Sequence, residues 1–333
     1  MSGNKKNITV IIVIIVGVAL LVTFFALRVY AKERIVTIGI ARWVSNPEYD
    51  RNIQGFKSGL VDAGFIEGVN IRYIIENPEA DKAVQRNIIQ SFIDKKVDLV
   101  YSLTTPGTLI AKEMITDTPI VFSIVTYPVE AGIIESTESS GNNLVGTRNY
   151  ISVSRQFNQI TRVVENAKNI AFIHRKDEPN SVIQEEEFGD YLKKQGIEIY
   201  DVAAVTLDDI RSRLSHLINE MDALYAACDT LIQSGGEELV IQISKIYGKP
   251  SFTCNKDGVL KGALIGNVAD FYNIGKLSGD KAALILRGAK PSQLFTDSHR
   301  GDYLMVNLNT AAELGIDITK DVLNDAKEII LHD

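Results

Sequence analysis

Cysteine, tryptophan and histidine are scarce in this chain of 333 residues, which contains two cysteines, one tryptophan and four histidines. The two cysteines, Cys228 and Cys254, cannot build a disulfide-dense scaffold, and no Cys/His cluster has the spacing of zinc ligands. The sequence also lacks a Gly-x-Gly-x-x-Gly turn after a strand, a Walker A lysine loop, a His-Glu-x-x-His motif and a Gly-x-Ser-x-Gly elbow. We therefore expect no cofactor and no metal, and the enzyme classes that these motifs serve are disfavoured.

An excess of positive charge is lacking as well. Acidic residues number 42 and basic residues 35, which gives a net charge of −7. A general nucleic-acid binder needs a basic surface, so nucleic acid is not expected as a partner. Apolar residues make up 45% of the chain and charged residues 23%, which is the profile of a globular protein.

The first thirty residues contain the longest apolar run. No residue from Ile8 to Leu27 is charged, and a helix of this length, at about 1.5 Å per residue, spans roughly the 30 Å hydrocarbon thickness of a bilayer. We therefore expect a tail at 1–7 and a transmembrane helix at 8–29 that anchors the chain. A cleaved signal peptide is the alternative, with Val29-Tyr30-Ala31 as the cleavage site, but a signal core usually runs about 7–15 residues.

Basic residues flank this apolar run on both sides and do not choose its orientation. No cysteine lies near the run, which excludes a lipid-modified N-terminus. We place the remaining chain outside the cytoplasm because of its architecture, which is described next. The expected location is thus the cell membrane, with a single-pass anchor and an external body.

Beyond Arg34, short apolar runs rich in β-branched residues alternate with helical segments. The predicted strands are 35–40, 71–75, 98–103, 120–125, 143–147, 170–174, 198–203, 223–227 and 251–253. The predicted helices are 49–63, 82–94, 106–114, 154–164, 185–195, 211–219 and 235–247. Such alternation is typical of parallel sheets covered by helices on both faces. Because the alternation restarts at 154, the sequence predicts an α/β protein with two doubly wound parallel-sheet lobes.

Ligands bind beyond the carboxyl ends of the strands in an open parallel sheet, so the residues that follow each strand are the candidate site. In the first lobe these are Trp43, Asn46, Thr104, Thr105 and Tyr127. Thr105 is a good N-cap and Pro106 a good first helical residue, and a helix N-terminus beside two threonine hydroxyls also suits a carboxylate. Trp43 is either a packing residue or an apolar wall over a ligand, and Tyr127 either lies in a turn or faces the cleft.

In the second lobe the corresponding residues are Asn180, Ser181, Asp229 and Asn255. Asn180 and Ser181 are typical of a helix start, and their side chains would also reach a ligand. Asp229 either caps the next helix or pairs with a ligand ammonium. An anion-binding helix N-terminus, one carboxylate and several aromatic residues together suit a zwitterion with an apolar side chain, such as an amino acid.

A series of short motifs, taken in order along residues 35–320, resembles the substrate-binding proteins of ABC transporters. These proteins have the type I periplasmic-binding fold, and the resemblance is to the branch that includes tryptophan- and tyrosine-binding members. The motifs include Gly55-Phe56…Gly59-Leu60…Gly64-Phe65…Gly68-Val69-Asn70, Thr105-Pro106, Asn142-Asn143-Leu144-Val145-Gly146, Glu178-Pro179-Asn180-Ser181, Asp222-Ala223-Leu224-Tyr225…Asp229 and Val306-Asn307…Ala311…Leu314-Gly315-Ile316.

The resemblance implies a hinge with several crossovers. The chain would return to the first lobe near Ala269, form a helix over Tyr272–Arg287 and cross back near Tyr303. Lobe 1 would then comprise 35–148 plus 270–300, and lobe 2 would comprise 149–269 plus 301–333. The resemblance also implies that Asn180, Ser181 and Asp229 face the ligand together with the Thr104–Thr105 loop. Tyr127 departs from the family, which often has an aspartate before this proline.

The function that the resemblance implies is that of an extracytoplasmic solute-binding component of an ABC importer and not that of an enzyme. The two lobes would close on a small ligand, with an amino acid favoured, and the closed form would dock on an ABC permease with its ATPase. A ligand-sensing subunit for a membrane partner is one alternative. A cofactor-independent racemase with paired cysteines is another, but Cys228 and Cys254 both fall in the second lobe and not on facing lobes.

Overall fold

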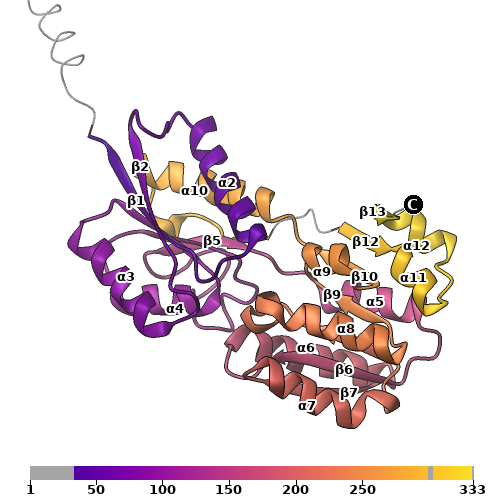
Figure 1. The fold of residues 1–333 in the computed structure, drawn as a ribbon. Coiled ribbons are helices and arrows are strands. Elements are labelled where there is room, and N and C mark those ends of the chain that lie inside the picture. The colour runs from indigo at the N-terminus through magenta and orange to yellow at the C-terminus, as the bar shows by residue number, and fades with distance from the viewer. Residues whose placement is uncertain (1–33, 299–302, 332–333) are drawn as a thin grey trace, which may run out of the picture.

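Two lobes, each built on one β-sheet, make up the computed structural model, which describes residues 34–298 and 303–331 (Figure 1). The first sheet is parallel throughout, with the strand order β11-β5-β4-β3-β1-β2. Its strands are β1 (Val36–Ala41), β2 (Ile71–Glu76), β3 (Leu99–Leu103), β4 (Ile120–Ser123), β5 (Leu144–Arg148) and β11 (Asp297–Ser298). Its helices are α2 (Pro47–Asp62), α3 (Lys82–Asp94), α4 (Thr105–Met114) and α10 (Phe271–Leu286), with a short turn η3 (Pro291–Gln293).

The second sheet has the order β13-β12-β10-β9-β8-β6-β7. Its strands are β6 (Asn169–Arg175), β7 (Glu198–Ala204), β8 (Ala223–Ala226), β9 (Ser251–Thr253), β10 (Ile265–Val268), β12 (Tyr303–Asn307) and β13 (Ala326–Ile330). The accompanying helices are α5 (Val153–Val163), α6 (Pro179–Lys194), α7 (Leu207–Leu217), η1 (Ile218–Glu220), η2 (Ile232–Gly236), α8 (Glu237–Tyr247), α9 (Lys256–Lys261), α11 (Leu308–Leu314) and α12 (Lys320–Asp325). The two-lobed α/β architecture predicted from the alternation is confirmed.

One strand pair of the second sheet departs from the purely parallel arrangement that the alternation predicts. β12 runs antiparallel to β10, and its first residue, Tyr303, is paired with the last residue of β10, Val268. The chain leaves β10 for the first lobe and re-enters the second sheet beside the point where it left. It therefore runs back along β10 in the opposite direction.

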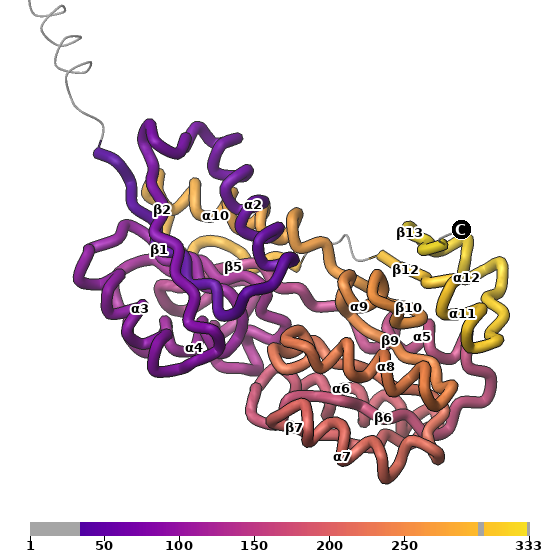
Figure 2. The backbone as a smooth tube through the Cα atoms, in the orientation of Figure 1, coloured from indigo at the N-terminus to yellow at the C-terminus, as the bar shows by residue number. Residues whose placement is uncertain are grey.

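The chain passes between the lobes at three places (Figure 2). It crosses from β5 to α5, from β10 to α10, and from β11 to β12 by a link that includes 299–302, which lie outside the described residues. The helix that the resemblance implied over Tyr272–Arg287 is α10, and it packs on α2 in the first lobe. This first-lobe helix thus comes from a part of the sequence far from the strands that it covers.

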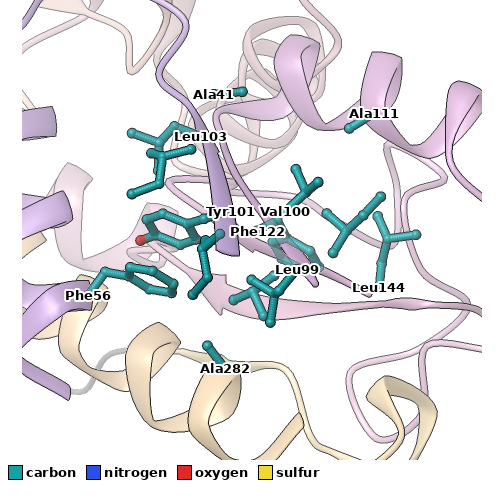
Figure 3. Packing of buried hydrophobic residues seen from close by; sticks show 14 of the residues in the cluster. Ala41, Phe56, Leu99, Val100, Tyr101, Leu103, Ala111, Phe122, Leu144 and Ala282 are labelled. Carbon is teal, nitrogen blue, oxygen red and sulfur yellow. The ribbon is translucent and has the colours of Figure 1, made fainter. Parts of the chain in front are cut away.

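The core of the first lobe lies between the sheet and its two helical layers (Figure 3). Tyr101 of β3 stacks on Phe56 of α2, with the ring centroids 3.8 Å apart and the planes at 9°. On the same face, α2 and α10 approach so closely that a Cβ added to Gly275 would lie 1.9 Å from the carbonyl oxygen of Asn52. Glycine is therefore needed at this crossing, which holds the returning helix in the first lobe.

Candidate functional site

A small cavity lies between the lobes, at the carboxyl ends of the strands of both sheets. The first lobe contributes the residues that follow β3, β4 and β5, and the second lobe contributes those that follow β6 and β8. The lining residues are Tyr49, Thr104, Thr105, Pro106, Ile124, Asn149, Glu178, Asn180, Cys228, Asp229, Thr230 and Gln233. This is the strand-end position that the sequence reasoning predicts for a ligand.

The backbone is strained just after three strands of the first sheet, on the first-lobe side of the cavity. Trp43, Thr104 and Ile124 have φ angles of 89°, 68° and 55°, and each comes within two residues of the end of a strand. Positive φ is rare for any residue with a Cβ and is an outlier for the β-branched threonine and isoleucine. Strain of this kind costs on the order of 1–3 kcal/mol per residue and clusters at ligand-binding edges, where the surrounding fold enforces it.

Two buried polar atoms of lining residues have no hydrogen-bond partner, and they lie on opposite lobes. They are the hydroxyl oxygen of Thr104 and the side-chain oxygen of Asn180. The amide nitrogen of Asn180 donates to the carbonyl oxygen of Cys228 at 3.2 Å, which leaves its Oδ1 as an acceptor without a donor. Buried polar groups in folded proteins are nearly always paired, so both atoms indicate a missing partner in the cavity.

Two carboxyl groups, those of Asp229 and Glu178, lie on the second-lobe side of the cavity. Asp229 accepts backbone N–H groups of Arg175 at 2.7 Å and Ile232 at 2.9 Å, and it is 1% exposed. Glu178 accepts from the N–H and the hydroxyl of Thr230. Burial raises the pKa of the Asp229 carboxyl above its ordinary value, and burial together with the charge of Asp229 raises the pKa of Glu178 to about 7.

Arg175 neutralises the charge of the Asp229–Glu178 pair only in part. Arg175 Nε lies 3.4 Å from Glu178 Oε1 but closer, at 2.7 Å, to Asp177 Oδ1. A cation placed in the cavity would stabilise the ionised carboxylates, because an opposite charge within several ångströms favours the charged form. The second-lobe side of the cavity therefore suits an ammonium group.

Of the site residues predicted from the sequence, the structure brings Thr104, Thr105, Asn180 and Asp229 together around the cavity. Thr105 is the first residue of α4, whose first turn has backbone N–H groups without intrahelical partners. Asp229 both caps the following turn and lines the cavity, so the two alternatives for this residue are compatible.

Asn46 and Asn255 line a neighbouring pocket that also lies between the lobes. Asn46 caps α2 by accepting from the N–H of Glu48, and its Nδ2 lies 3.4 Å from the carbonyl oxygen of Gln233. Asn255 accepts from Gln233 Nε2 at 2.9 Å and donates to Glu237 at 3.2 Å. These two asparagines thus contact the ligand cavity indirectly, through Gln233.

Trp43, Tyr127 and Ser181 are buried but are not among the lining residues. The ring of Trp43 packs beside Gly107, and the hydroxyl of Ser181 donates to the carbonyl oxygen of Arg175 at 2.6 Å. The hydroxyl of Tyr127 donates to Glu187 at 2.6 Å. In this arrangement of the lobes, the hydroxyls of Ser181 and Tyr127 are engaged elsewhere, whereas Trp43 Nε1 is buried without a hydrogen-bond partner.

Sequence reasoning missed Tyr49, Glu178 and Gln233 as lining residues. Glu178 stands next to the Pro179–Asn180 helix start, so its place after β6 was an available signal. Tyr49 belongs to α2 of the first lobe, and its hydroxyl donates to Gln233 of the second lobe at 2.6 Å. Nothing in the sequence indicates this pairing, because the two residues are 184 positions apart.

The two cysteines form a disulfide between the loops that follow β8 and β9, which are neighbouring strands. Their Cα atoms are 6.0 Å apart, a usual separation for such a bridge. Because both sulfurs are bonded to each other within one lobe, they are not available as a facing acid and base. This arrangement disfavours the racemase alternative.

Replacing both cysteines by serine is expected to lower the free energy of unfolding by about 3 kcal/mol, because the bridge closes a loop of 26 residues in the unfolded chain. Cys228 lines the cavity, but the bond that it makes to Asn180 there is through its backbone carbonyl, which serine keeps, so ligand affinity should stay largely intact. Urea unfolding and ligand titration of the parent and the double serine variant measure the two effects. A catalytic turnover present in the parent and lost in the variant would contradict the expectation and restore the enzyme hypothesis.

Within 34–298 and 303–331, no helix has the length and apolar character needed to cross a membrane. The predicted anchor at 8–29 lies outside the described residues. The described ranges also contain no cluster of three or more His, Cys, Asp or Glu side chains that could hold a metal ion.

Comparison with known proteins identifies relatives across most of the chain. The model of a family described as ABC transporter substrate binding protein matches residues 37–330. A tyrosine-binding protein from Clostridioides difficile (strain R20291) is 30% identical over 277 residues, which make up 83% of this chain and 80% of that protein.

Solved structures show the same fold. A domain from Streptococcus pneumonia in complex with L-Trp is 26% identical and has a TM-score of 0.85, over 89% of this chain and all of that one. The ligand-free, open structure of a substrate binding protein with adhesive properties from Clostridium difficile is also 26% identical. Its TM-score is 0.71, over 90% of this chain and all of that one. These relatives are solute-binding proteins and not enzymes.

Proposed function

This chain belongs to the substrate-binding proteins of ABC transporters, and from that premise we propose that it captures a free amino acid, with an aromatic one favoured, between its two lobes. One observation carries the proposal. A cavity at the lobe interface has an unpartnered buried hydroxyl on one lobe and an unpartnered buried amide oxygen beside two carboxylates on the other.

A zwitterion would satisfy both sides of this cavity. Its carboxylate would accept a hydrogen bond from Thr104 and lie at the N-terminus of α4, where the helix dipole and free N–H groups favour an anion. Its ammonium would donate to Asn180 Oδ1 and pair with Asp229. Because these partners lie on different lobes, the ligand would hold the lobes together.

The remaining lining of the cavity favours a ligand with an apolar side chain. Tyr49, Pro106 and Ile124 supply apolar contact area. The tyrosine-binding relative and the L-Trp complex support an aromatic side chain.

We propose that the lobes close on the ligand by rotation about the crossovers. At the same 26% identity, the present arrangement agrees better with the L-Trp complex than with the ligand-free open structure, with TM-scores of 0.85 and 0.71. A ligand that contacts both lobes only when they are closed shifts the population toward closure. The closed form would then dock on an ABC permease and its ATPase, which together would import the ligand.

The location proposed for the body is outside the cytoplasm, with residues 8–29 as a single-pass anchor or, alternatively, a cleaved signal. The disulfide supports this proposal, since such bonds persist in oxidising compartments and are rare in the cytosol. An anchor would keep the protein near its permease and raise their effective concentration. The alternative function, a ligand-sensing subunit, would use the same cavity but would report the ligand to a different membrane partner.

Thermal unfolding of the full-length protein with L-tyrosine, L-tryptophan and matched analogues tests this function. Tyramine lacks the carboxylate of tyrosine, and 3-(4-hydroxyphenyl)propionate lacks its ammonium. A melting temperature raised by the amino acids, but by neither analogue, is expected, because a ligand stabilises the folded state that binds it. A rise with a sugar or nucleoside and none with amino acids would overturn the ligand assignment.

A further inference from the structure

A second set of contacts joins the lobes beside the ligand cavity, through residues that do not line it. Glu187 of α6, in the second lobe, accepts a hydrogen bond from the hydroxyl of Tyr127 at 2.6 Å and another from the hydroxyl of Tyr150 at 2.7 Å. Tyr127 follows β4 in the first lobe, and Tyr150 lies in the crossover between β5 and α5. The two rings meet edge to face, with centroids 5.6 Å apart, and the guanidinium of Arg148 lies 4.4 Å from the centroid of the Tyr150 ring.

These contacts are separate from the groups that would bind the ligand. None of Tyr127, Tyr150 and Glu187 lines the cavity. The Tyr49–Gln233 contact also joins the lobes, but both of its residues line the cavity, so its effect on closure cannot be separated from contact with the ligand. The Glu187 contacts do not have this ambiguity, because substitutions there change a contact between the lobes without changing a lining residue.

We propose that Glu187 and Tyr127 form a hinge latch, which holds the lobes closed and sets the ligand affinity without touching the ligand. The inference rests on the proposed function, since it concerns closure around that ligand. Tyr127 and Glu187 lie on different lobes, and the neighbouring Tyr150 lies in a segment that connects them. A hydrogen bond of 2.6 Å is lost when its atoms separate by about 1 Å, so a small rotation near the crossover is enough to break it.

The chemistry of the latch makes its contribution substantial. Its acceptor is a carboxylate, and hydrogen bonds to charged groups are about twice as strong as those between neutral groups. Tyr127 is 4% exposed in the closed arrangement, so its hydroxyl is largely removed from water there. Loss of one such bond shifts the closure equilibrium, and with it the dissociation constant of a ligand bound by the closed form, by about 10-fold to 100-fold.

Two substitutions and a control test the latch. Tyr127→Phe keeps the ring and removes the hydroxyl, and Glu187→Gln keeps the shape of the side chain and removes its charge. Tyr191→Phe is the control, because Tyr191 lies on the same helix and its ring packs on Phe157 inside the second lobe. The experiment measures the association and dissociation rates of L-tryptophan and L-tyrosine with the full-length protein and its variants by stopped-flow fluorescence.

We expect Tyr127→Phe and Glu187→Gln to raise the dissociation rate by about 10-fold to 100-fold with little change in the association rate, because opening releases the ligand. Glu187→Gln leaves only a weaker, uncharged acceptor for Tyr127, so Tyr127→Phe should raise the dissociation rate less in the Glu187→Gln background than in the parent. Tyr191→Phe should behave as the parent.

Parent-like dissociation rates in both latch variants would overturn the latch and leave the proposed function intact. Failure of the parent itself to bind any amino acid would overturn the proposed function, and the latch inference with it. A lower melting temperature without faster dissociation would also overturn it, because that result describes a purely structural contact.

Discussion

Asparagine in place of Asp229 is expected to weaken amino acid binding by about 2–5 kcal/mol, because it leaves a buried ligand ammonium without its charged partner. Asp229 lines the cavity beside Asn180, whose oxygen lacks a donor, and no lysine is among the lining residues of this cavity. Isothermal titration of the parent and the variant with L-tyrosine or L-tryptophan measures the loss.

The same substitution will also lower stability, which has to be separated from the loss of affinity. The Asp229 carboxylate accepts two backbone N–H groups, and an asparagine side chain can accept only through its one oxygen. Asp222→Asn is a matched control, since Asp222 accepts the N–H groups of Lys168 and Asn169 at the opposite end of β8. Both of these N–H groups bond to the single oxygen Oδ2, which the oxygen of an asparagine can replace. The control should therefore lose less stability than Asp229→Asn and no affinity. An affinity of Asp229→Asn equal to that of Asp222→Asn would remove Asp229 from the ligand site.

Alanine in place of Gly275 is expected to lower the free energy of unfolding by about 3–5 kcal/mol, the upper range for a single overpacked position. The added methyl group would lie 1.9 Å from the backbone oxygen of Asn52, so α2 and α10 would have to move apart along their whole contact. A backbone atom cannot rotate away as a side-chain end can. Urea denaturation of the parent and the variant gives the size of the effect.

Gly189→Ala is the matched control for this prediction. Gly189 lies within α6, and an added Cβ would have its nearest neighbour, in Ile199, at an ordinary 3.5 Å. Alanine at this position is expected to stabilise the helix by about 0.5–1 kcal/mol, because glycine is the poorer helix former. A loss below about 1 kcal/mol for Gly275→Ala would show that the α2–α10 crossing has room to adjust.

Helix ends were predicted to within two residues for α2, α3, α4, α5 and α8, but the helices expected over 185–195 and 211–219 begin six and four residues earlier, at Pro179 and Leu207. The helix expected over 82–94 is α3, with the same ends, and Asp81 caps it by accepting the N–H groups of Ala83 and Val84. The helix expected over 235–247 begins two residues later, at Glu237, because η2 precedes it with a kink at Ser234 and Gly235. A π-helical turn such as η2 has no characteristic spacing of apolar residues, so the sequence pattern does not reveal it.

The short strands late in the chain were harder to predict. β10 and β12 have only four and five residues, and their apolar patterns do not show which sheet they join or in which direction they run. The direction of β12 follows from where the chain returns to the second lobe. That return point depends on α10 packing against α2, which is a contact between distant segments.

The sequence by itself determined the α/β alternation, the two lobes and the strand ends at which Thr104, Thr105, Asn180 and Asp229 stand, because strand period, helix period and capping are local properties. Only the tertiary structure decided which strand ends face each other. It placed Glu178 beside Asp229, Tyr49 against Gln233, and Tyr127 against Glu187 and not in the cavity lining. Each of these pairings joins residues 51 or more positions apart. The packing of the two lobes brings them together, and no local pattern encodes that packing.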